Sequence, residues 1–247
     1  MHRFFVPPAW ITGEVARLEG DVARQVVRVL RMSPGDEIIL LDNSGSEYRV
    51  SLTGLNRDTV EGDVLSVANG HGEPSVHVTL YQGMLKGKGF QWVLQKGTEI
   101  GVTTFVPLIC RRSVPEERHD RHNVRYPRWD KIVAEAAEQS GRCLLPRVEP
   151  PTSFEDACES VRDSSCVSLI PWELEEATDL RSALQGMQPQ RVNIFIGPEG
   201  GFEEREVEHA RSCGIPSVSL GRRILRSETA AIATLAAVLY ELGELGR

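Results

Sequence analysis

The N-terminal part of the chain changes from a strand-like segment to a helical pattern and then back to strands. Residues 3–6 are strand-like, and residues 20–32 carry apolar side chains at the spacing of one helical face, namely Val22, Val26, Val27 and Leu30. Residues 35–67 contain three apolar stretches that are separated by turn residues at 43–45 and 56–58. This pattern predicts a small β-barrel that carries one helix.

From Val76 onward, short strand-like stretches alternate with segments of helical periodicity. The strand-like stretches are residues 76–83, 103–109, 166–170, 193–197 and 217–221. The helical segments are residues 90–100, 127–141 and 229–243. Strands that alternate with helices predict a mostly parallel sheet with helices on both faces, which is an α/β architecture.

The two patterns meet at a segment that is typical of a linker. Gly70, Gly72 and Pro74 lie within a few residues of one another and interrupt both kinds of periodicity. We therefore expect two domains, a β-barrel over residues 1–70 and an α/β domain over residues 74–247.

Composition and charge exclude several classes of protein. The chain is 40% apolar and 26% charged, as ordinary globular proteins are. No apolar run reaches the length of a membrane span, and the first residues lack the order of a signal peptide, so we expect a cytoplasmic protein without membrane contact. The net charge of −7 implies that any binding of nucleic acid is confined to a local basic surface.

The spacing of cysteines and histidines indicates no metal centre. The five cysteines form no C-x-x-C pair, and the six histidines form no H-x-x-x-H pair. We expect reduced, mostly buried thiols and no metal requirement.

A glycine-rich segment, residues 197–201, follows one predicted strand and precedes a helix, as phosphate-binding loops do. It contains Glu199, whose carboxylate would repel a phosphate in a partly desolvated site. Three further acids, Glu203, Glu204 and Glu206, complement the N-terminus of the following helix. The loop therefore favours a cationic or neutral ligand, and the alternative is a tight turn that only caps the helix.

Another glycine loop, residues 83–89, matches neither the Walker spacing nor the dinucleotide fingerprint. A phosphate loop is therefore not indicated there, and a Rossmann oxidoreductase is retained only as an alternative function.

A further loop, residues 220–230, follows the strand-like stretch that ends at Gly221. Arg226 and Glu228 come just before a long apolar helix, for which Ser227 is the predicted N-cap and Thr229 the alternative. Loops that follow parallel strands meet at the carboxyl edge of the sheet, where α/β proteins bind ligands. The segments 197–201 and 220–230 are therefore expected to form one crevice.

Four segments of the chain carry a resemblance to a known family. They are IGPEGGF at 196–202, LGRRILRSETA at 220–230, EAAEQSGR at 135–142 and RVLRMSPGD at 28–36. Together they resemble the ribosomal RNA small-subunit methyltransferase E family of the SPOUT superfamily, over essentially the whole chain and in the expected order.

The resemblance implies both a fold and an activity. The fold is an N-terminal PUA-like β-barrel that binds RNA, followed by a C-terminal SPOUT α/β domain with a deep trefoil knot. The activity is transfer of a methyl group from S-adenosylmethionine, bound in a bent form, to ring nitrogen 3 of a uridine in 16S ribosomal RNA. The resemblance also implies a homodimer, and the RNA substrate is either free or within the assembled small subunit.

The resemblance places the cofactor against two glycine loops and one further strand. The implied contacts are Leu169, Ile196, Gly197, Pro198, Glu199, Gly200, Leu220, Gly221, Ile224, Leu225, Arg226, Thr229 and Ala230.

The catalytic hypothesis concerns three residues of the same loops. Arg226 stabilises negative charge on a uracil oxygen, and Glu228 or Glu199 orients the base or accepts its imide proton. The alternative for Arg226 and Glu228 is an ion pair at the start of a helix.

Candidate contacts with RNA come from basic segments and from one motif. They are Arg24, Arg28, Arg31, Arg111, Arg112, Gln139 and Arg142. The basic segment that begins at Arg111 also holds Arg118, Arg121, Arg125, Arg128 and Lys131. A solvated charged face is the alternative for these arginines.

Two other functions fit the same sequence features. One is a SPOUT methyltransferase that acts on another RNA position, and the other is an RNA-binding ribosome-assembly factor without catalysis. The intact glycine loops favour an enzyme over the assembly factor.

Overall fold

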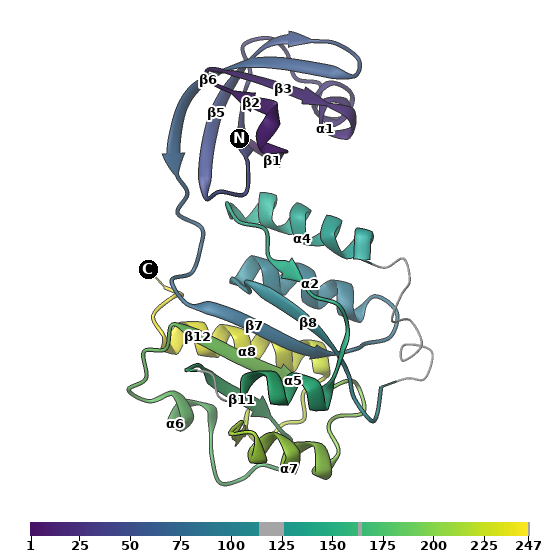
Figure 1. Ribbon diagram of the computed structural model, residues 1–247, viewed down its shortest axis with the longest axis vertical. Coiled ribbons are helices and arrows are strands. Elements are labelled where there is room, and N and C mark those ends of the chain that lie inside the picture. Colours follow the sequence, from purple (N-terminus) through teal and green to yellow (C-terminus); the bar gives the residue numbers. More distant parts are fainter. Residues whose placement is uncertain (114–125, 163–164, 247) are drawn as a thin grey trace. The chain divides into compact units, whose positions relative to one another are not determined.

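The computed structural model describes residues 1–113, 126–162 and 165–246 (Figure 1). Contacts divide the chain into two compact units, of which unit 1 is residues 1–73 and 134–145, and unit 2 is residues 74–133 and 146–247. The domain boundaries that we expect from the sequence do not assign residues 134–145 to the first domain, although these residues belong to unit 1. The predicted basic residues Arg118, Arg121 and Arg125 lie outside the described residues.

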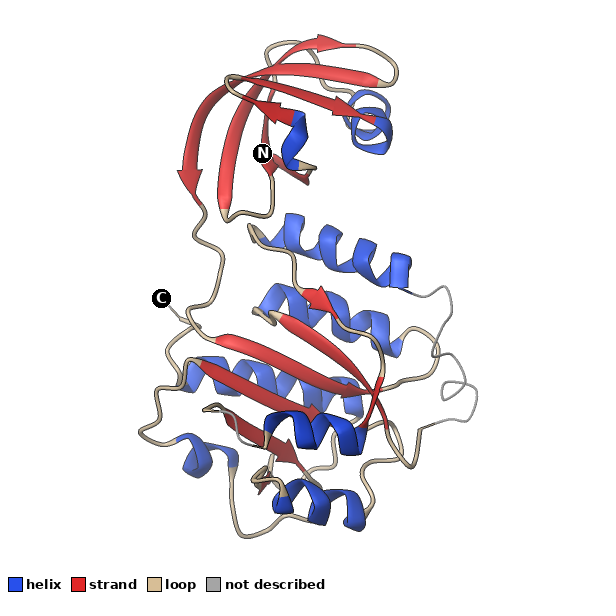
Figure 2. Ribbon diagram, in the orientation of Figure 1, coloured by secondary structure: helices blue, strands red, loops and turns tan. Residues whose placement is uncertain are grey.

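Unit 1 contains a six-stranded sheet in the order β1-β4-β5-β6-β3-β2 (Figure 2). The strands are β1 His2–Phe5, β2 Ile11–Thr12, β3 Val15–Glu19, β4 Glu37–Leu41, β5 Ser46–Leu55 and β6 Thr59–Asn69. β1 pairs with β4 in parallel, and all other neighbours in this sheet are antiparallel. The three strands expected within residues 35–67 are β4, β5 and β6, so this prediction is confirmed.

Alternate side chains of these strands form the core of unit 1. Ile38 and Leu40 of β4 are buried with Val50 and Leu52 of β5, as a two-residue period requires. A 3-10 turn, η1, covers Pro8–Trp10. The predicted helix begins as α1 (Gly20–Arg24), widens into a π-helical turn, η2 (Gln25–Val29), and buries Val26 against this core.

Unit 2 contains a sheet in the order β10-β8-β7-β12-β11-β13, and β9 pairs with β8. The strands are β7 His77–Gly83, β8 Thr104–Ile109, β9 Arg147–Val148, β10 Thr152–Ser153, β11 Val167–Pro171, β12 Arg191–Ile196 and β13 Ser217–Val218. Every pairing in it is parallel. The carboxyl ends of β7, β12 and β11 therefore meet at one edge.

Helices cover both faces of this sheet, as the alternation of strands and helices predicts. They are α2 Gly89–Ile100, α4 Tyr126–Ser140, α5 Phe154–Val161, α6 Leu180–Leu184, α7 Glu204–Ser212 and α8 Ser227–Glu241. Ile194 and Ile196 of β12 lie in the core cluster that contains α2 and α8, whereas Phe195 lies in the cluster that contains α5 and α7. The predicted α/β architecture is confirmed, although the sequence patterns had not indicated the short helices α5 and α6.

The ends of β7 and β12 approach each other so closely that only glycine fits at position 83. A Cβ atom on Gly83 would lie 2.3 Å from the main-chain nitrogen of Pro198. Among the described residues, no helix is long and apolar enough to cross a membrane. The trefoil knot implied by the resemblance stays a prediction.

Candidate active site

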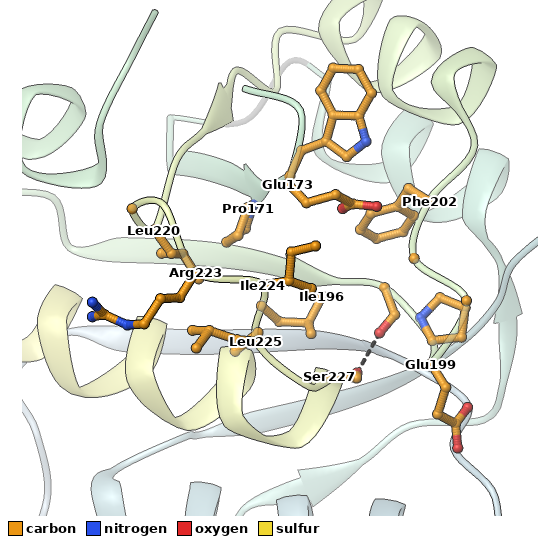
Figure 3. A pocket seen from close by; sticks show the side chains of 17 residues that line it. Pro171, Glu173, Ile196, Glu199, Phe202, Leu220, Arg223, Ile224, Leu225 and Ser227 are labelled. Carbon is orange, nitrogen blue, oxygen red and sulfur yellow. Dashed lines mark hydrogen bonds between the residues drawn. The ribbon is translucent and has the colours of Figure 1, made fainter. Parts of the chain in front are cut away.

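A cavity of about 180 Å³ lies at the carboxyl edge of the parallel sheet in unit 2 (Figure 3). It is formed by the end of β11, by the loop after β12 and by the loop before α8. Its lining residues are Pro171, Trp172, Glu173, Ile196, Gly197, Pro198, Glu199, Gly200, Gly201, Phe202, Leu220, Gly221, Arg223, Ile224, Leu225, Ser227 and Ala230. The structure thus brings the two glycine loops of the sequence into one crevice.

The loop after β12 is a tight turn that is held from two sides. The N–H of Gly201 donates to the carbonyl oxygen of Pro198 at 2.9 Å, and Gly201 has a φ of +69°, which favours glycine. Arg112, an expected RNA contact, donates from Nη1 to the carbonyl oxygen of Gly200 at 2.8 Å. The turn does more than cap α7, because it also forms one wall of the cavity.

Ser227 connects the two glycine loops. Its hydroxyl donates to the carbonyl oxygen of Gly197 at 2.5 Å and accepts from Nε2 of Gln82 at 3.0 Å. The prediction that Ser227 is the N-cap of α8 is wrong. Arg226 occupies the N-cap, because the Ser227 hydroxyl is turned toward Gly197 instead of toward its own helix.

Glu199 is exposed, lines the cavity and is fixed by the neighbouring loop. Its Oε1 accepts a hydrogen bond of 2.7 Å from the main-chain N–H of Lys86, which lies in the glycine segment after β7. The carboxylate therefore uses a backbone donor of the kind that phosphate loops present to their ligand. This contact agrees with the expectation that the crevice is not a phosphate site.

The opposite part of the cavity is mainly apolar, with Arg223 beside Leu220. Leu220, Ile224 and Leu225 come from the loop before α8, and Ile196 comes from the end of β12 (Figure 3). Ile224 is 86% exposed, which is unusual for so large an apolar side chain. A flat apolar ligand that covered Ile224 would remove this surface from water and gain free energy.

The wall after β11 contains residues that the sequence patterns do not indicate. Arg211 lies over the Trp172 ring, with its Cζ atom 5.5 Å from the ring centroid, and forms a 2.9 Å ion pair with Glu175. Hydrogen bonding from Ser217 and from main-chain N–H groups lowers the pKa of Glu175 to about 2. This arrangement keeps Trp172 against the cavity.

Four lining residues are neither among the expected cofactor contacts nor within the segments 197–201 and 220–230, namely Pro171, Trp172, Glu173 and Phe202. The first three directly follow the predicted strand at 166–170. A parallel sheet brings the ends of its strands together at one edge. The position of these three residues directly after a predicted strand therefore indicates that they lie at the site.

Three of the expected cofactor contacts do not line the cavity. Leu169 is buried in the core cluster, and Arg226 and Thr229 are exposed beside the lining residues. Glu228 is half-buried, and its Oε1 lies so near Gly89, at the start of α2, that a Cβ atom there would be only 3.1 Å away. Within the described parts of the chain, Arg226 and Glu228 form no ion pair with each other.

The expected RNA contacts of unit 1 differ in their exposure. Arg28, Arg31 and Gln139 are exposed, and Arg24 forms ion pairs with Asp21 and, at 3.6 Å, with Asp58. Arg142 is only 2% exposed, and its Nη2 lies 2.6 Å from Oε2 of Glu73. Because Arg142 is buried in this ion pair, it makes a structural contact in place of the expected contact with RNA.

In unit 2, Arg111 and Arg112 are both exposed. The main-chain N–H of Arg111 donates to Glu206 at 2.9 Å, and its guanidinium lies 3.5 Å from Glu155.

One group of side chains in unit 2 offers ligand atoms of metal-binding type. Glu159, His209 and Cys213 place one such atom each within 4.8 Å of the others. Arg162 lies 3.3 Å from the same Glu159 oxygen and 3.7 Å from the Cys213 sulfur, so a cation is already present in this cluster. We assign no metal to it.

Comparison with known proteins agrees with this geometry. A family model described as RNA methyltransferase domain matches residues 72–239, and one described as RNA methyltransferase PUA domain matches residues 18–65. The chain is 33% identical over 228 residues to the ribosomal RNA small subunit methyltransferase E of Bacillus subtilis, which covers 91% of this chain and 89% of the relative. It is also 33% identical to the Synechocystis protein of the same name, over 96% of this chain and 77% of the relative.

A solved structure extends the similarity to the fold. The ribosomal RNA small subunit methyltransferase E from Neisseria gonorrhoeae, bound to S-adenosyl methionine, has a TM-score of 0.86, 32% identity and 97% coverage of each chain. The expected fold class, a PUA-like β unit followed by a SPOUT-type α/β domain, is thereby confirmed. The chain belongs to the ribosomal RNA small subunit methyltransferase E family of RNA methyltransferases.

Proposed function

We propose that this protein transfers a methyl group from S-adenosylmethionine to ring nitrogen 3 of a uridine in 16S ribosomal RNA. The observation that carries the proposal is the cavity, which is lined by the two loops that carry the family resemblance and has one apolar and one acidic part. Family membership and the cofactor-bound relative from Neisseria gonorrhoeae support the same assignment.

The chemistry of the cavity fits this cofactor. Leu220, Ile224 and Leu225 provide apolar contacts for an adenine ring, and the carboxylates of Glu173 and Glu199 suit a ligand with positive charge. When bound, S-adenosylmethionine supplies an electrophilic methyl group on its sulfonium. The glycines at 197, 200 and 201 let a ligand approach the main chain closely.

The protein has two tasks in the reaction, namely to hold the uracil in line and to remove its imide proton. Glu199 is better placed than Glu228 to accept the proton, because Glu199 lines the cavity and Glu228 lies against the start of α2. Arg226 is exposed next to the lining residues and is free to approach a uracil oxygen, where a cation stabilises developing negative charge.

RNA binding is assigned to exposed basic side chains. Arg28 and Arg31 of unit 1, with Arg24 beside them, provide local positive charge despite the acidic total. A comparison of naked RNA with isolated small subunits tests whether the 16S ribosomal RNA is bound free or within the subunit. The cytoplasmic location stays a prediction.

A homodimer is the proposed assembly, and α8 supports it. One face of α8 buries Leu235 and Val238, but Ala233, Ala237 and Tyr240 on the helix are exposed, the last by 69%. A helix that is apolar on all sides is usually buried on all sides. A second copy of the chain would cover this exposed face.

The decisive experiment compares ribosomal RNA from strains with and without this protein by mass spectrometry of the nucleosides. Loss of one methyluridine from 16S ribosomal RNA is expected. The purified protein should then restore it with S-adenosylmethionine, and naked RNA and isolated subunits should be offered in parallel to identify the substrate.

The same measurements separate the alternative functions. An unchanged methyluridine content with another methylated nucleoside missing indicates a different RNA position. Absence of cofactor binding in calorimetry indicates a non-catalytic assembly factor.

A further inference from the structure

Two glutamates line the cavity, and their carboxylates are in different states. Oε1 of Glu199 accepts the N–H of Lys86 at 2.7 Å. Glu173 also lines the cavity, but within the described residues its side chain has no hydrogen bond and no ion pair. Both oxygens of Glu173 are therefore available to a ligand in the cavity.

The segment that carries Glu173 is held in place on both sides of it. The N–H of Trp172 donates to Val218 of β13 at 3.0 Å, and the N–H of Glu175 donates to the carbonyl oxygen of Trp172 at 3.2 Å. Arg211 contacts both the Trp172 ring and the Glu175 carboxylate. Glu173 thus extends from a preorganised turn, which lowers the entropic cost of binding through it.

Gly201 leaves the space that the Glu173 carboxylate occupies. A Cβ atom on Gly201 would lie 2.8 Å from Oε1 of Glu173. Figure 3 shows Glu173 next to Phe202, across the cavity from Leu220 and Arg223. The carboxylate therefore lies against the main chain of the glycine turn, away from the apolar part of the cavity.

The cavity thus has an apolar end and an end that carries the Glu173 carboxylate. A ligand with an adenine at one end and an amino acid at the other matches these two ends. With the adenine against Leu220, Ile224 and Leu225, the amino-acid end reaches the acidic part. An ammonium group has three N–H donors, whereas a sulfonium has none, so only the ammonium gains hydrogen bonds from a free carboxylate. We propose that Glu173 binds the α-ammonium group of the cofactor, an inference that rests on the proposed function.

Calorimetry with three ligands tests this assignment. S-adenosylmethionine has both the ammonium and the sulfonium, S-adenosylhomocysteine keeps only the ammonium, and 5′-methylthioadenosine has neither. For Glu173→Gln we expect the affinity for the first two to fall by about tenfold and that for the third to stay unchanged. The matched control is Glu176→Gln, which removes the same charge from an exposed residue that does not line the cavity and should bind all three ligands as the wild type does.

Each other result contradicts the inference in a distinct way. Loss of affinity for S-adenosylmethionine alone assigns Glu173 to the sulfonium, and equal loss for all three ligands assigns it to the shape of the cavity. Unchanged affinities exclude any contact with the ligand. If the wild type binds none of the three, the proposed function itself fails, whereas wild-type binding with an unaffected Glu173→Gln variant overturns only this inference.

Discussion

The hydroxyl of Ser227 lies 2.5 Å from the carbonyl oxygen of Gly197 and so joins the two loops that form most of the cavity wall. Gln82, at the end of β7, donates to the same hydroxyl. Two strand ends and the start of α8 are thus connected through one buried side chain, and the geometry of the cavity depends on it.

Replacing Ser227 with Ala removes both hydrogen bonds and leaves Gln82 and Gly197 without this partner. We expect the protein to lose about 1–3 kcal/mol of stability, because buried polar groups that lose their partner are costly. S-adenosylmethionine should also bind more weakly in calorimetry. Ser66→Ala in β6, where the side chain is exposed, is the control. Unchanged affinity together with an unchanged melting temperature would show that the connection is dispensable.

Replacing Gly83 with Ala places a methyl group 2.3 Å from the Pro198 nitrogen, which belongs to rigid main chain. The loop after β12 must move, and we expect a cost of about 1–3 kcal/mol with weaker cofactor binding. Thermal unfolding and calorimetry measure the two effects. Gly54→Ala is the control, because its nearest neighbour would be at an ordinary 3.6 Å. Equal melting temperatures for the two variants would refute the prediction.

Replacing Arg226 with Ala tests the proposed catalytic cation. Turnover is expected to fall by about 10²–10³, as for the loss of a preorganised group that stabilises transition-state charge. Cofactor affinity should stay near that of the wild type, because Arg226 does not line the cavity. Normal methyl transfer at saturating cofactor would remove Arg226 from the mechanism.

Replacing Ala237 with Glu places a charge on the exposed apolar face of α8. If a second copy covers this face, the charge is buried on association, and the variant should be monomeric in light scattering. Ser66→Glu, at an exposed strand position of unit 1, is the control and should not change the mass. A wild type that is already monomeric contradicts the proposed assembly.

The ion pair of the buried Arg142 with the half-buried Glu73 predicts a pH dependence of stability. Burial raises the pKa of Glu73, but hydrogen bonds from Arg142 and from the Leu144 and Cys143 N–H groups outweigh it, so the pKa lies below its usual 4.5. The stabilisation is fully present above pH 4.5 and is lost as the pH falls through the lower pKa of the folded state.

In Arg142→Ala, the free energy of unfolding should fall less between pH 6 and pH 3 than it does in the wild type. At pH 7 the variant should be less stable than the wild type by about 3–5 kcal/mol. Thermal unfolding across this pH range measures both effects. A variant with the wild-type pH profile would show that the pair does not set the stability of unit 1.

The positions of most strands and helices could be predicted because their periodicity is local. The strand at 193–197 and the helix at 229–243 correspond to β12 and α8, within a few residues at each end. The short helix α5 was missed, since eight residues contain too few turns to display a period.

The parts of the site that were missed depend on contacts across the chain. Ser227 looks like an N-cap from its neighbours, but its hydroxyl binds Gly197, thirty residues away in sequence. Arg142 lies in the motif EAAEQSGR, which is an expected RNA contact, yet Glu73 pairs with it over a separation of 69 residues. Neither partner can be identified from local spacing, because the fold alone brings them together.

The contact between Gln82 and Ser227 spans 145 positions of the chain. During synthesis, the residues of β7 leave the ribosome long before those of α8, so the loop after β12 has no partner on its far side until residue 227 has emerged. A growing chain that has not yet reached residue 227 therefore lacks one wall of the cavity.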